Sequence, residues 1–322
     1  MKKTENSESI IEKSSLNNRI SNCVKEAIPP ALKTGLWLLS ITVPVSFLVF
    51  ILKITGVLQI IAHFFTPIFS FMGLPGESAI VFTTACLLNV YSSIAVIQTL
   101  GLAGRVVTIL ALMCLISHNL PVESMVQKRT GSSAIKMILI RLFSGFAGAV
   151  ILNKMLPPDS PGISEIFAKT SVPAVGFTVE FQLWAVGMLR LCIKIMVLIT
   201  LLMIFQRILE EFGVTGFLSR ILKYPLMLLG VPHQAAFLWI VANTLGLAYG
   251  SGVMMDHIKR GKISRSNVNI LNYHVAISHS LLEDTLLFVA IGVSAWWITI
   301  PRLALAAVVV WSKRFIDMFF KK

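Results

Sequence analysis

Long runs of apolar residues, each interrupted by a few isolated polar positions, dominate the hydrophobic pattern of this chain. The clearest runs cover residues 36–52, 106–116, 183–205 and 286–300. Several approach the roughly 20 residues that a helix needs to cross the hydrocarbon core of a bilayer. They lack the strict apolar–polar alternation of membrane β-barrel strands. Because every backbone polar group inside lipid needs an internal partner, the pattern predicts an all-α integral membrane protein, folded as a helical bundle.

An internal repeat is superimposed on these runs. Ile116-Ser117-His118-Asn119-Leu120 recurs as Ile277-Ser278-His279-Ser280-Leu281, with Glu123 and Glu283 just beyond the two segments. Ionisable side chains are costly inside a membrane and usually mark function there. Their recurrence at corresponding places predicts a duplicated protein with a site between its halves.

The repeat extends to both sides of the histidines. Gly73-Leu74-Pro75 recurs as Gly230-Val231-Pro232, and Asn89-Val90-Tyr91-Ser92-Ser93 corresponds to Leu247-Ala248-Tyr249-Gly250-Ser251. Each half also opens with a long apolar segment. We therefore divide the chain into a polar cytosolic tail (1–33), a first repeat (34–156), an extracytoplasmic linker (157–180) and a second repeat (181–322).

Basic residues indicate how the repeats are oriented. In the first half they follow the His-Glu segment: Lys128, Arg129, Lys136 and Arg141. In the second half they precede it: Lys259, Arg260, Lys262 and Arg265. Since cytoplasmic loops carry the excess of Lys and Arg, equivalent loops are expected on opposite sides of the membrane.

The resulting topology is an inverted repeat with about six crossings and two re-entrant hairpins. Residues 59–72 and 77–100 are expected to form the arms of the first hairpin, with its tip near Glu77. Both chain termini are expected in the cytosol. This places the protein in the cytoplasmic (inner) membrane of a bacterium as a multi-pass protein.

Composition agrees with this reading: 56% of the residues are hydrophobic and 13% are charged, against about 25% charged in soluble domains. The formal charge of +13 is assigned to cytosolic loops rather than to nucleic acid, because no basic motif with interleaved aromatics is present. The chain has no P-loop, no H-E-x-x-H and no nucleophile motif, so neither an enzyme nor a bound cofactor is expected.

Polar residues around the expected hairpins are candidates for substrate contact. Glu77 and Ser78 follow Gly73-x-Pro75-Gly76, where a helix start would offer a carboxylate and free N–H groups to a solute, or where Glu would simply favour the helix dipole. The remaining candidates interrupt apolar runs: Asn89, Tyr91, Ser92, Ser93, Asn243 and Tyr249. Such residues either mark an unwound, ligand-binding helix or form hydrogen bonds between helices.

The repeated histidines are candidates for ion binding or coupling, together with Asn119. His118 and Glu123 are separated by Pro121, whereas His279 and Glu283 are expected on one face of a helix. Each His–Glu pair could bind a divalent ion or relay protons, or its two charges could simply neutralise each other in a structural role. Asp284 and His274 are expected nearer the surface.

The same residues carry a family resemblance. Gly73-Leu74-Pro75-Gly76-Glu77-Ser78-Ala79 followed by Asn89 resembles the Gate motif, or nucleoside-recognition domain, and His118-Asn119-Leu120-Pro121-Val122-Glu123 resembles its stand-alone branch. Related domains occur in concentrative nucleoside transporters, spore maturation membrane proteins and the membrane part of ferrous-iron uptake GTPases. The resemblance implies tandem Gate halves with helical hairpins whose tips contact substrate.

These observations predict a secondary transporter-like protein for a small polar solute or ion, of nucleoside type or a divalent cation. The alternative is a scaffold or signalling component that retains the fold without transport. The expected partners are the lipid bilayer, the solute or ion, and a second Gate subunit or a homo-oligomer, with no nucleic acid.

Overall fold

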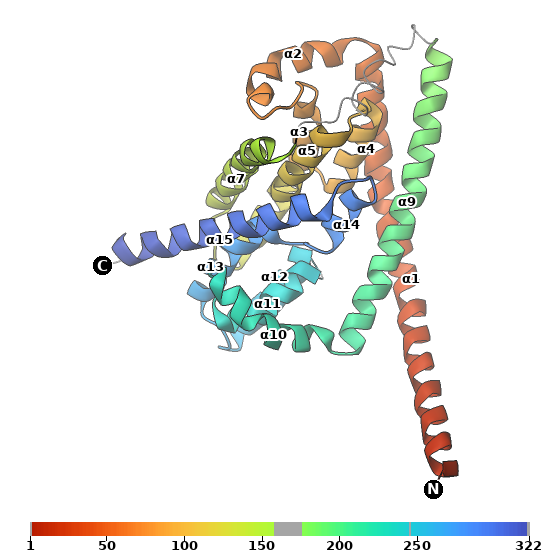
Figure 1. Cartoon of the computed structure of the whole chain (residues 1–322), viewed down its shortest axis with the longest axis vertical. Coiled ribbons are helices and arrows are strands. Elements are labelled where there is room, and N and C mark those ends of the chain that lie inside the picture. The colour runs from red at the N-terminus through yellow and green to blue at the C-terminus, as the bar shows by residue number, and fades with distance from the viewer. Residues whose placement is uncertain (1, 158–175, 245, 321–322) are drawn as a thin grey trace.

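The computed structural model describes residues 2–157, 176–244 and 246–320, with side chains from residue 16 onward except at 248 and 320 (Figure 1). These residues form helices joined by short turns, and no strand occurs among them. The predicted all-α membrane fold is therefore confirmed. Residues 158–175 of the expected linker at 157–180 lie outside the described residues, and its last four positions belong to the helix that begins at Phe177.

The first half contains seven helices in the described part of the chain. They are α1 (Lys2–Ile54), α2 (Val57–Ser70), α3 (Ser78–Leu87), α4 (Val90–Leu100), α5 (Gly104–Ser117), α6 (Leu120–Arg129) and α7 (Ala134–Met155). The expected tail at 1–33 is continuous with the first apolar helix, because α1 runs through it without a break.

The second half repeats this order. Its helices are α9 (Phe177–Glu211), α10 (Val214–Leu228), the short 3-10 helix η1 (His233–Ala235), α11 (Ala236–Thr244), α12 (Gly246–Lys259), α13 (Arg265–Ser278), α14 (Glu283–Val289) and α15 (Ala295–Phe320).

The first helices of the two halves, α1 and α9, pack side by side and antiparallel (Figure 1). Arg19, about a third of the way along α1, donates to Glu211 at the C-terminal end of α9 over 2.8 Å. At the other end of the pair, the ring centroids of Phe50 and Phe181 lie 6.2 Å apart. Equivalent helices thus run in opposite directions, as the predicted inverted repeat requires.

Turns with left-handed backbone geometry recur at equivalent places in the two halves. The glycine pairs, with their φ angles, are Gly56 (78°) and Gly213 (62°), Gly73 (71°) and Gly230 (86°), Gly101 (67°) and Gly261 (67°), and Gly131 (109°) and Gly292 (97°). Glycine accepts this region because it has no Cβ. The repeat therefore preserves the turns that set the path of the backbone, even where the helices between them differ in sequence.

The helical hairpins have different arms from those expected. The turn of the first hairpin lies at Leu88 and Asn89, and its arms are α3 and α4, which pack against each other. The second hairpin consists of α11 and α12. The prediction that 59–72 forms an arm with its tip near Glu77 was wrong: α2 is a separate helix, and the turn carrying Gly76 packs against it. A Cβ on Gly76 would lie 2.0 Å from the carbonyl oxygen of Ala62.

Five helices in the described residues are long and apolar enough to cross a membrane. They cover Leu16–Ile54, Gly104–Arg129, Ala134–Met155, Phe177–Glu211 and Ala295–Phe319. A sixth crossing, expected where α13 lies, is not among them, because α13 has only 14 residues and carries Asn267, Asn272 and His274. The hairpin helices are too short to span alone.

A candidate ion site and a pocket between the two halves

The two repeated histidines meet at the centre of the interface between the halves. α5 ends at Ser117 and α13 ends at Ser278, so His118 and His279 both follow a helix in extended backbone geometry. The next residues, Asn119 and Ser280, adopt left-handed φ angles of 48° and 51°. These matching turns bring the two Nε2 atoms to 3.3 Å from each other.

Two carboxylates surround the histidine pair. Glu123 places Oε1 3.2 Å from His118 Nε2 and Oε2 3.0 Å from His279 Nε2. Asp284 places Oδ2 3.4 Å from His118 Nε2. We call these four residues, His118, His279, Glu123 and Asp284, the central cluster. It joins one half to the other, since His279 and Asp284 belong to the second repeat.

The structural counterpart of Glu123 is Asp284 rather than Glu283, because each lies five residues after its histidine. Asp284 is only 5% exposed, so the expectation that it lies near the surface was wrong. Glu283 does not share a helix face with His279, since α14 begins at Glu283. Its carboxylate instead accepts a hydrogen bond of 2.8 Å from Tyr91 of the first half.

Two fully buried arginines hold the histidine turns. Arg141 on α7 donates to the carbonyl oxygens of Ile116 and His118 over 2.7 and 2.6 Å. Arg302 on α15 donates in the same way to Ile277 and His279, over 3.2 and 2.6 Å. Both have 0% exposure. They donate hydrogen bonds to carbonyl groups that would otherwise lack a partner where α5 and α13 end.

The two arginines differ in one contact. Arg141 Nη1 lies 2.7 Å from Glu123 Oε2 and forms an ion pair with it. Arg302 has no such pair among the described residues, and uses Nη2 to reach the carbonyl of Leu115 at 3.4 Å. Arg141 was counted among the basic loop residues in the sequence, and that assignment was wrong because its side chain is buried at the cluster.

The break between the two arms of each helical hairpin also contacts a histidine turn. The amide N–H of Asn119 donates to Ala85 O at the end of α3, over 2.8 Å. The equivalent N–H of Ser280 donates to Ala242 O at the end of α11, over 3.3 Å. Asn243 accepts a further bond of 3.4 Å from the N–H of Leu281. The backbone breaks of both hairpins therefore adjoin the central cluster.

Other predicted site residues take structural positions or lie elsewhere. Asn89 caps α4 by accepting from Ser92 N over 2.8 Å, Ser92 Oγ lies 3.3 Å from the hydroxyl of Thr42 on α1, and Ser93 Oγ donates to Val90 O over 2.8 Å. Glu77 and Ser78 lie at the far end of α3 from the cluster. Tyr249 is 56% exposed and does not reach it.

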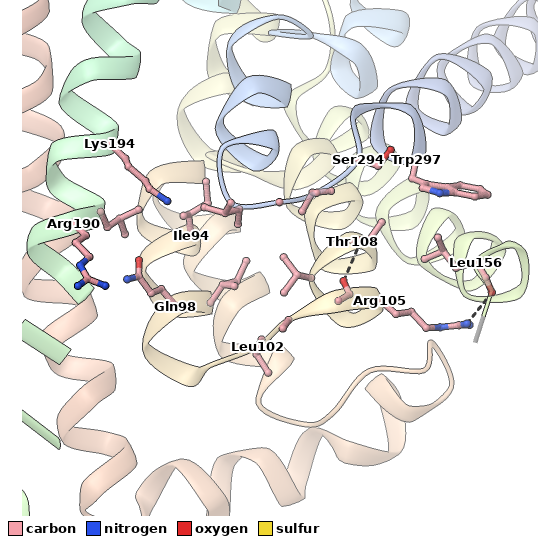
Figure 2. A pocket seen from close by; sticks show the side chains of 18 of the residues that line it. Ile94, Gln98, Leu102, Arg105, Thr108, Leu156, Arg190, Lys194, Ser294 and Trp297 are labelled. Atoms are coloured by element: carbon pink, nitrogen blue, oxygen red, sulfur yellow. Dashed lines mark hydrogen bonds between the residues drawn. The ribbon is translucent and has the colours of Figure 1, made fainter. Parts of the chain in front are cut away.

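A cavity of about 740 Å³ opens between α4, α5, α9 and the connection from α14 to α15, and the four residues of the central cluster are not among those that line it (Figure 2). Lys194 reaches into it from α9, Arg190 lies beside Gln98, and Trp297 lies across from them. Arg105 also lines the cavity, but its guanidinium is directed to the carbonyl of Leu156 over 2.8 Å. We call this cavity the open pocket.

The repeat places an equivalent location at the opposite end of the interface, between α13 and the connection from α6 to α7. Residues 104–108 and 291–294 of the open pocket correspond to 265–269 and 130–133 at this end. Here the space is closed by hydrogen bonds. Asn272 donates to the hydroxyls of Thr130 and Ser132 over 2.8 and 2.9 Å, and Gln127 donates to Asn272 O over 3.0 Å.

A further bond of 2.6 Å joins Ser132 Oγ to Asn269 Oδ1. We call these residues, Gln127, Thr130, Ser132, Asn269 and Asn272, the closed end. Two of its amide oxygens, Gln127 Oε1 and Asn272 Oδ1, are buried without a hydrogen-bond partner among the described residues. An unpaired buried acceptor weakens a polar network and favours its exchange for water.

Sequence reasoning missed Arg141, Arg302, Asp284 and the closed end as functional elements. The spacing of the arginines was a usable signal, because each follows its histidine by 23 residues (118 and 141, 279 and 302). His274 was expected near the surface and is fully buried, where its Nδ1 accepts from Trp239 Nε1 over 3.0 Å.

Comparison with known proteins defines the class. The model of the Gate family, described as nucleoside recognition, matches residues 36–156. The chain belongs to this family of membrane proteins, as the motif resemblance implied. It is 30% identical over 268 residues, 82% of this chain and 85% of the relative, to the "Uncharacterized membrane protein YvoD" of Bacillus subtilis (strain 168). No solved structure matches the chain.

Proposed function

We propose that this protein is a secondary transporter that works by alternating access to a site between its inverted halves. The single observation that carries the proposal is the unequal state of two equivalent places. The open pocket and the closed end are related by the repeat, and the central cluster lies between them. Inverted repeats that rock around a central site are the common construction of secondary transporters.

The distances along the helices support this arrangement. Thr108, at the open pocket, and Asn269, at the closed end, are each ten residues from the histidine that follows their helix. Each therefore lies roughly 15 Å from the cluster at 1.5 Å per residue. A solute or ion at the cluster would need only one end to open at a time.

The chemistry of the open pocket favours a small polar solute with negative charge. Arg190 and Lys194 supply two cations, Gln98 supplies an amide, and Trp297 supplies an aromatic ring. Its volume falls within the range of about 300–1,000 Å³ that small-molecule sites occupy. A phosphorylated or carboxylated nucleoside-type compound satisfies these groups, while a free cation suits the carboxylates of the cluster.

We place the protein in the cytoplasmic membrane with both termini in the cytosol. The closed end is flanked by Lys128, Arg129 and Arg265, so the positive-inside rule orients it toward the cytosol. The open pocket, which includes Leu156 and Pro157, then faces the outside. In this orientation we interpret the open pocket and the closed end as the two ends of an outward-facing state.

Paired cysteine variants test the alternating-access proposal. Thr108→Cys and Asn269→Cys would be compared in a background in which the partly exposed Cys192 is replaced by Ser. A membrane-impermeant maleimide applied to whole cells is expected to label the first and not the second. Equal labelling of both, unchanged on inside-out vesicles, would contradict the proposal.

A thermal-shift panel on purified protein identifies the transported class. Nucleosides, nucleoside monophosphates and divalent metal chlorides would be added separately, because a ligand that binds only the folded state raises its stability. Each compound that stabilises the protein is then tested for uptake by reconstituted vesicles. A co-purifying partner subunit, with no stabilising ligand and no flux, would favour the scaffold instead.

A further inference from the structure

The hydrogen bonds of the two central histidines define which nitrogen carries a hydrogen. Nδ1 of His118 lies 3.2 Å from Cys114 O, and Nδ1 of His279 lies 2.8 Å from Val275 O. A carbonyl oxygen only accepts, so each Nδ1 is the donor. In the neutral ring the Nε2 atom then presents a lone pair, which is the arrangement found in metal-binding histidines.

These lone pairs face one another and face carboxylates. The two Nε2 atoms are 3.3 Å apart, and Asp284 Oδ2 and Glu123 Oε2 lie 3.4 and 3.0 Å from the nearer nitrogen. Asp284 Oδ2 is buried and has no hydrogen-bond partner among the described residues. Acceptors gathered this closely repel each other unless a proton or a metal cation lies among them.

The separations match the edges of a metal coordination shell. Metal–nitrogen and metal–oxygen bonds of about 2.0–2.2 Å at tetrahedral angles put neighbouring ligand atoms roughly 3.3 Å apart. The ligand atoms of His118, His279 and Asp284 all lie within 4.8 Å of one another. Three such protein ligands leave a position for water or for a transported group.

The charges in and around the central cluster allow an added cation. The carboxylates of Glu123, Glu283 and Asp284 outnumber the guanidinium groups of Arg141 and Arg302, with neutral histidines. Arg141 already binds Glu123, so Glu123 serves as a neighbouring charge or an additional ligand. The positive groups keep such a site from binding its ion too tightly, which transport requires because the ion must also leave.

We propose that His118, His279 and Asp284, with Glu123 beside them, bind a divalent transition-metal ion that is shared by the two halves. Imidazole and carboxylate together suit Zn²⁺, Fe²⁺ and Mn²⁺. The ion is the cargo or the coupling ion of the transporter, and in that role the proposal rests on the function above. Binding itself requires only the geometry of the cluster.

Metal binding by purified full-length protein in detergent tests the site. Equilibrium dialysis against Zn²⁺, Mn²⁺ and Co²⁺, followed by elemental analysis, is expected to give one tightly held ion per chain. The visible absorption of bound Co²⁺ reports whether its ligands are nitrogen and oxygen in a tetrahedral arrangement. His118→Ala, His279→Gln and Asp284→Asn are each expected to weaken binding by about tenfold or more.

His63→Ala is the matched control, because His63 is an exposed histidine on α2 far from the cluster. It is expected to bind as the parent does. If an alanine variant elutes as an aggregate, the smaller changes Asp284→Asn and His279→Gln provide the comparison. Equal metal content in the cluster variants and the parent would overturn the proposal.

Uptake measurements separate this proposal from the transport function. Metal binding that needs the cluster, without flux of any compound, supports the metal site and overturns transport. Solute flux that needs His118, in a protein that binds no metal, overturns the metal site and leaves a proton as the coupled ion. A parent protein that binds no metal and transports no compound would overturn both the metal site and the transport function.

Discussion

The closed end and the open pocket are built from equivalent segments, yet one is sealed and the other is hollow. The difference begins in the two helices that lead to the histidines. On α13, Asn272 occupies the position that Ala111 occupies on α5, 161 residues earlier. The amide of Asn272 bonds to the connection between α6 and α7, whereas Ala111 packs in an apolar core.

The two ends of a duplicated fold can therefore differ in how readily they open. Hydrogen bonds at the closed end are specific in geometry, and water can replace them at moderate cost when the end opens. Among the described residues, the apolar surface of α5 makes no equivalent hydrogen bonds to the connection between α14 and α15. Asn272, Thr130 and Ser132 at the closed end correspond to Ala111, Ile291 and Val293 at the other end, and this group of polar-for-apolar differences makes the two ends unequal.

The largest expected effect comes from the arginines that anchor the histidine turns. Arg141→Met leaves the buried Glu123 carboxylate without its cation, and we expect a loss of about 3–5 kcal/mol of unfolding free energy. Arg302→Met removes hydrogen bonds to carbonyl groups and the longer-range attraction to Asp284, but breaks no ion pair among the described residues, and should cost less. Denaturant unfolding in detergent micelles measures both.

Arg260→Met provides the control, because Arg260 is exposed and Asp256 is its ion-pair partner among the residues that the structure describes. Exposed pairs contribute about 0–1 kcal/mol. If Arg302→Met were as damaging as Arg141→Met, the two halves would be equivalent at this contact, and the ion pair with Glu123 would add nothing.

A smaller effect is expected at the closed end. Asn272→Ala removes the bonds to Thr130 and Ser132, and should lower unfolding free energy by about 1–3 kcal/mol. On inside-out vesicles it should also increase labelling of a cysteine at position 269, since the closed end opens more often. Asn18→Ala, on the exposed surface of α1, should change neither quantity.

Tyr91→Phe tests the bond that crosses from the first hairpin to Glu283. Loss of this single hydrogen bond is expected to cost about 0.5–1.5 kcal/mol. Tyr249→Phe, at the corresponding place of the second hairpin, should be neutral because Tyr249 is 56% exposed and does not reach the cluster. Equal effects of the two changes would refute the difference between the hairpins.

The smallest effect on stability is expected in the open pocket. Lys194→Met should change unfolding free energy by less than about 0.5 kcal/mol, as surface substitutions do. It should abolish stabilisation by anionic compounds in the thermal-shift panel. Lys25→Met, on the exposed part of α1, should leave that stabilisation intact, and an unaffected ligand response in both variants would show that the pocket does not bind anions.

Much of the fold could be predicted because its signals are local. The apolar runs, the recurring glycine turns and the repeated His118 and His279 segments all lie in short stretches of sequence. Hairpin arms were assigned wrongly, since a Gly-Pro turn at residues 73–76 and a backbone break at Asn89 both resemble hairpin tips. Only packing distinguishes them: α2 lies beside the turn at Gly76, while α3 and α4 fold against each other at Asn89.

By itself, the sequence determined a duplicated helical membrane protein and the residues around which its site is built. Tertiary structure alone decided that the two histidines face each other, that Asp284 rather than Glu283 completes the cluster, and that one end is sealed. These outcomes depend on contacts between residues far apart in the chain: 161 positions for the two histidines and 166 positions for His118 and Asp284. Hydropathy and charge report how each residue meets lipid or water, whereas a site between halves depends on how the two halves are docked.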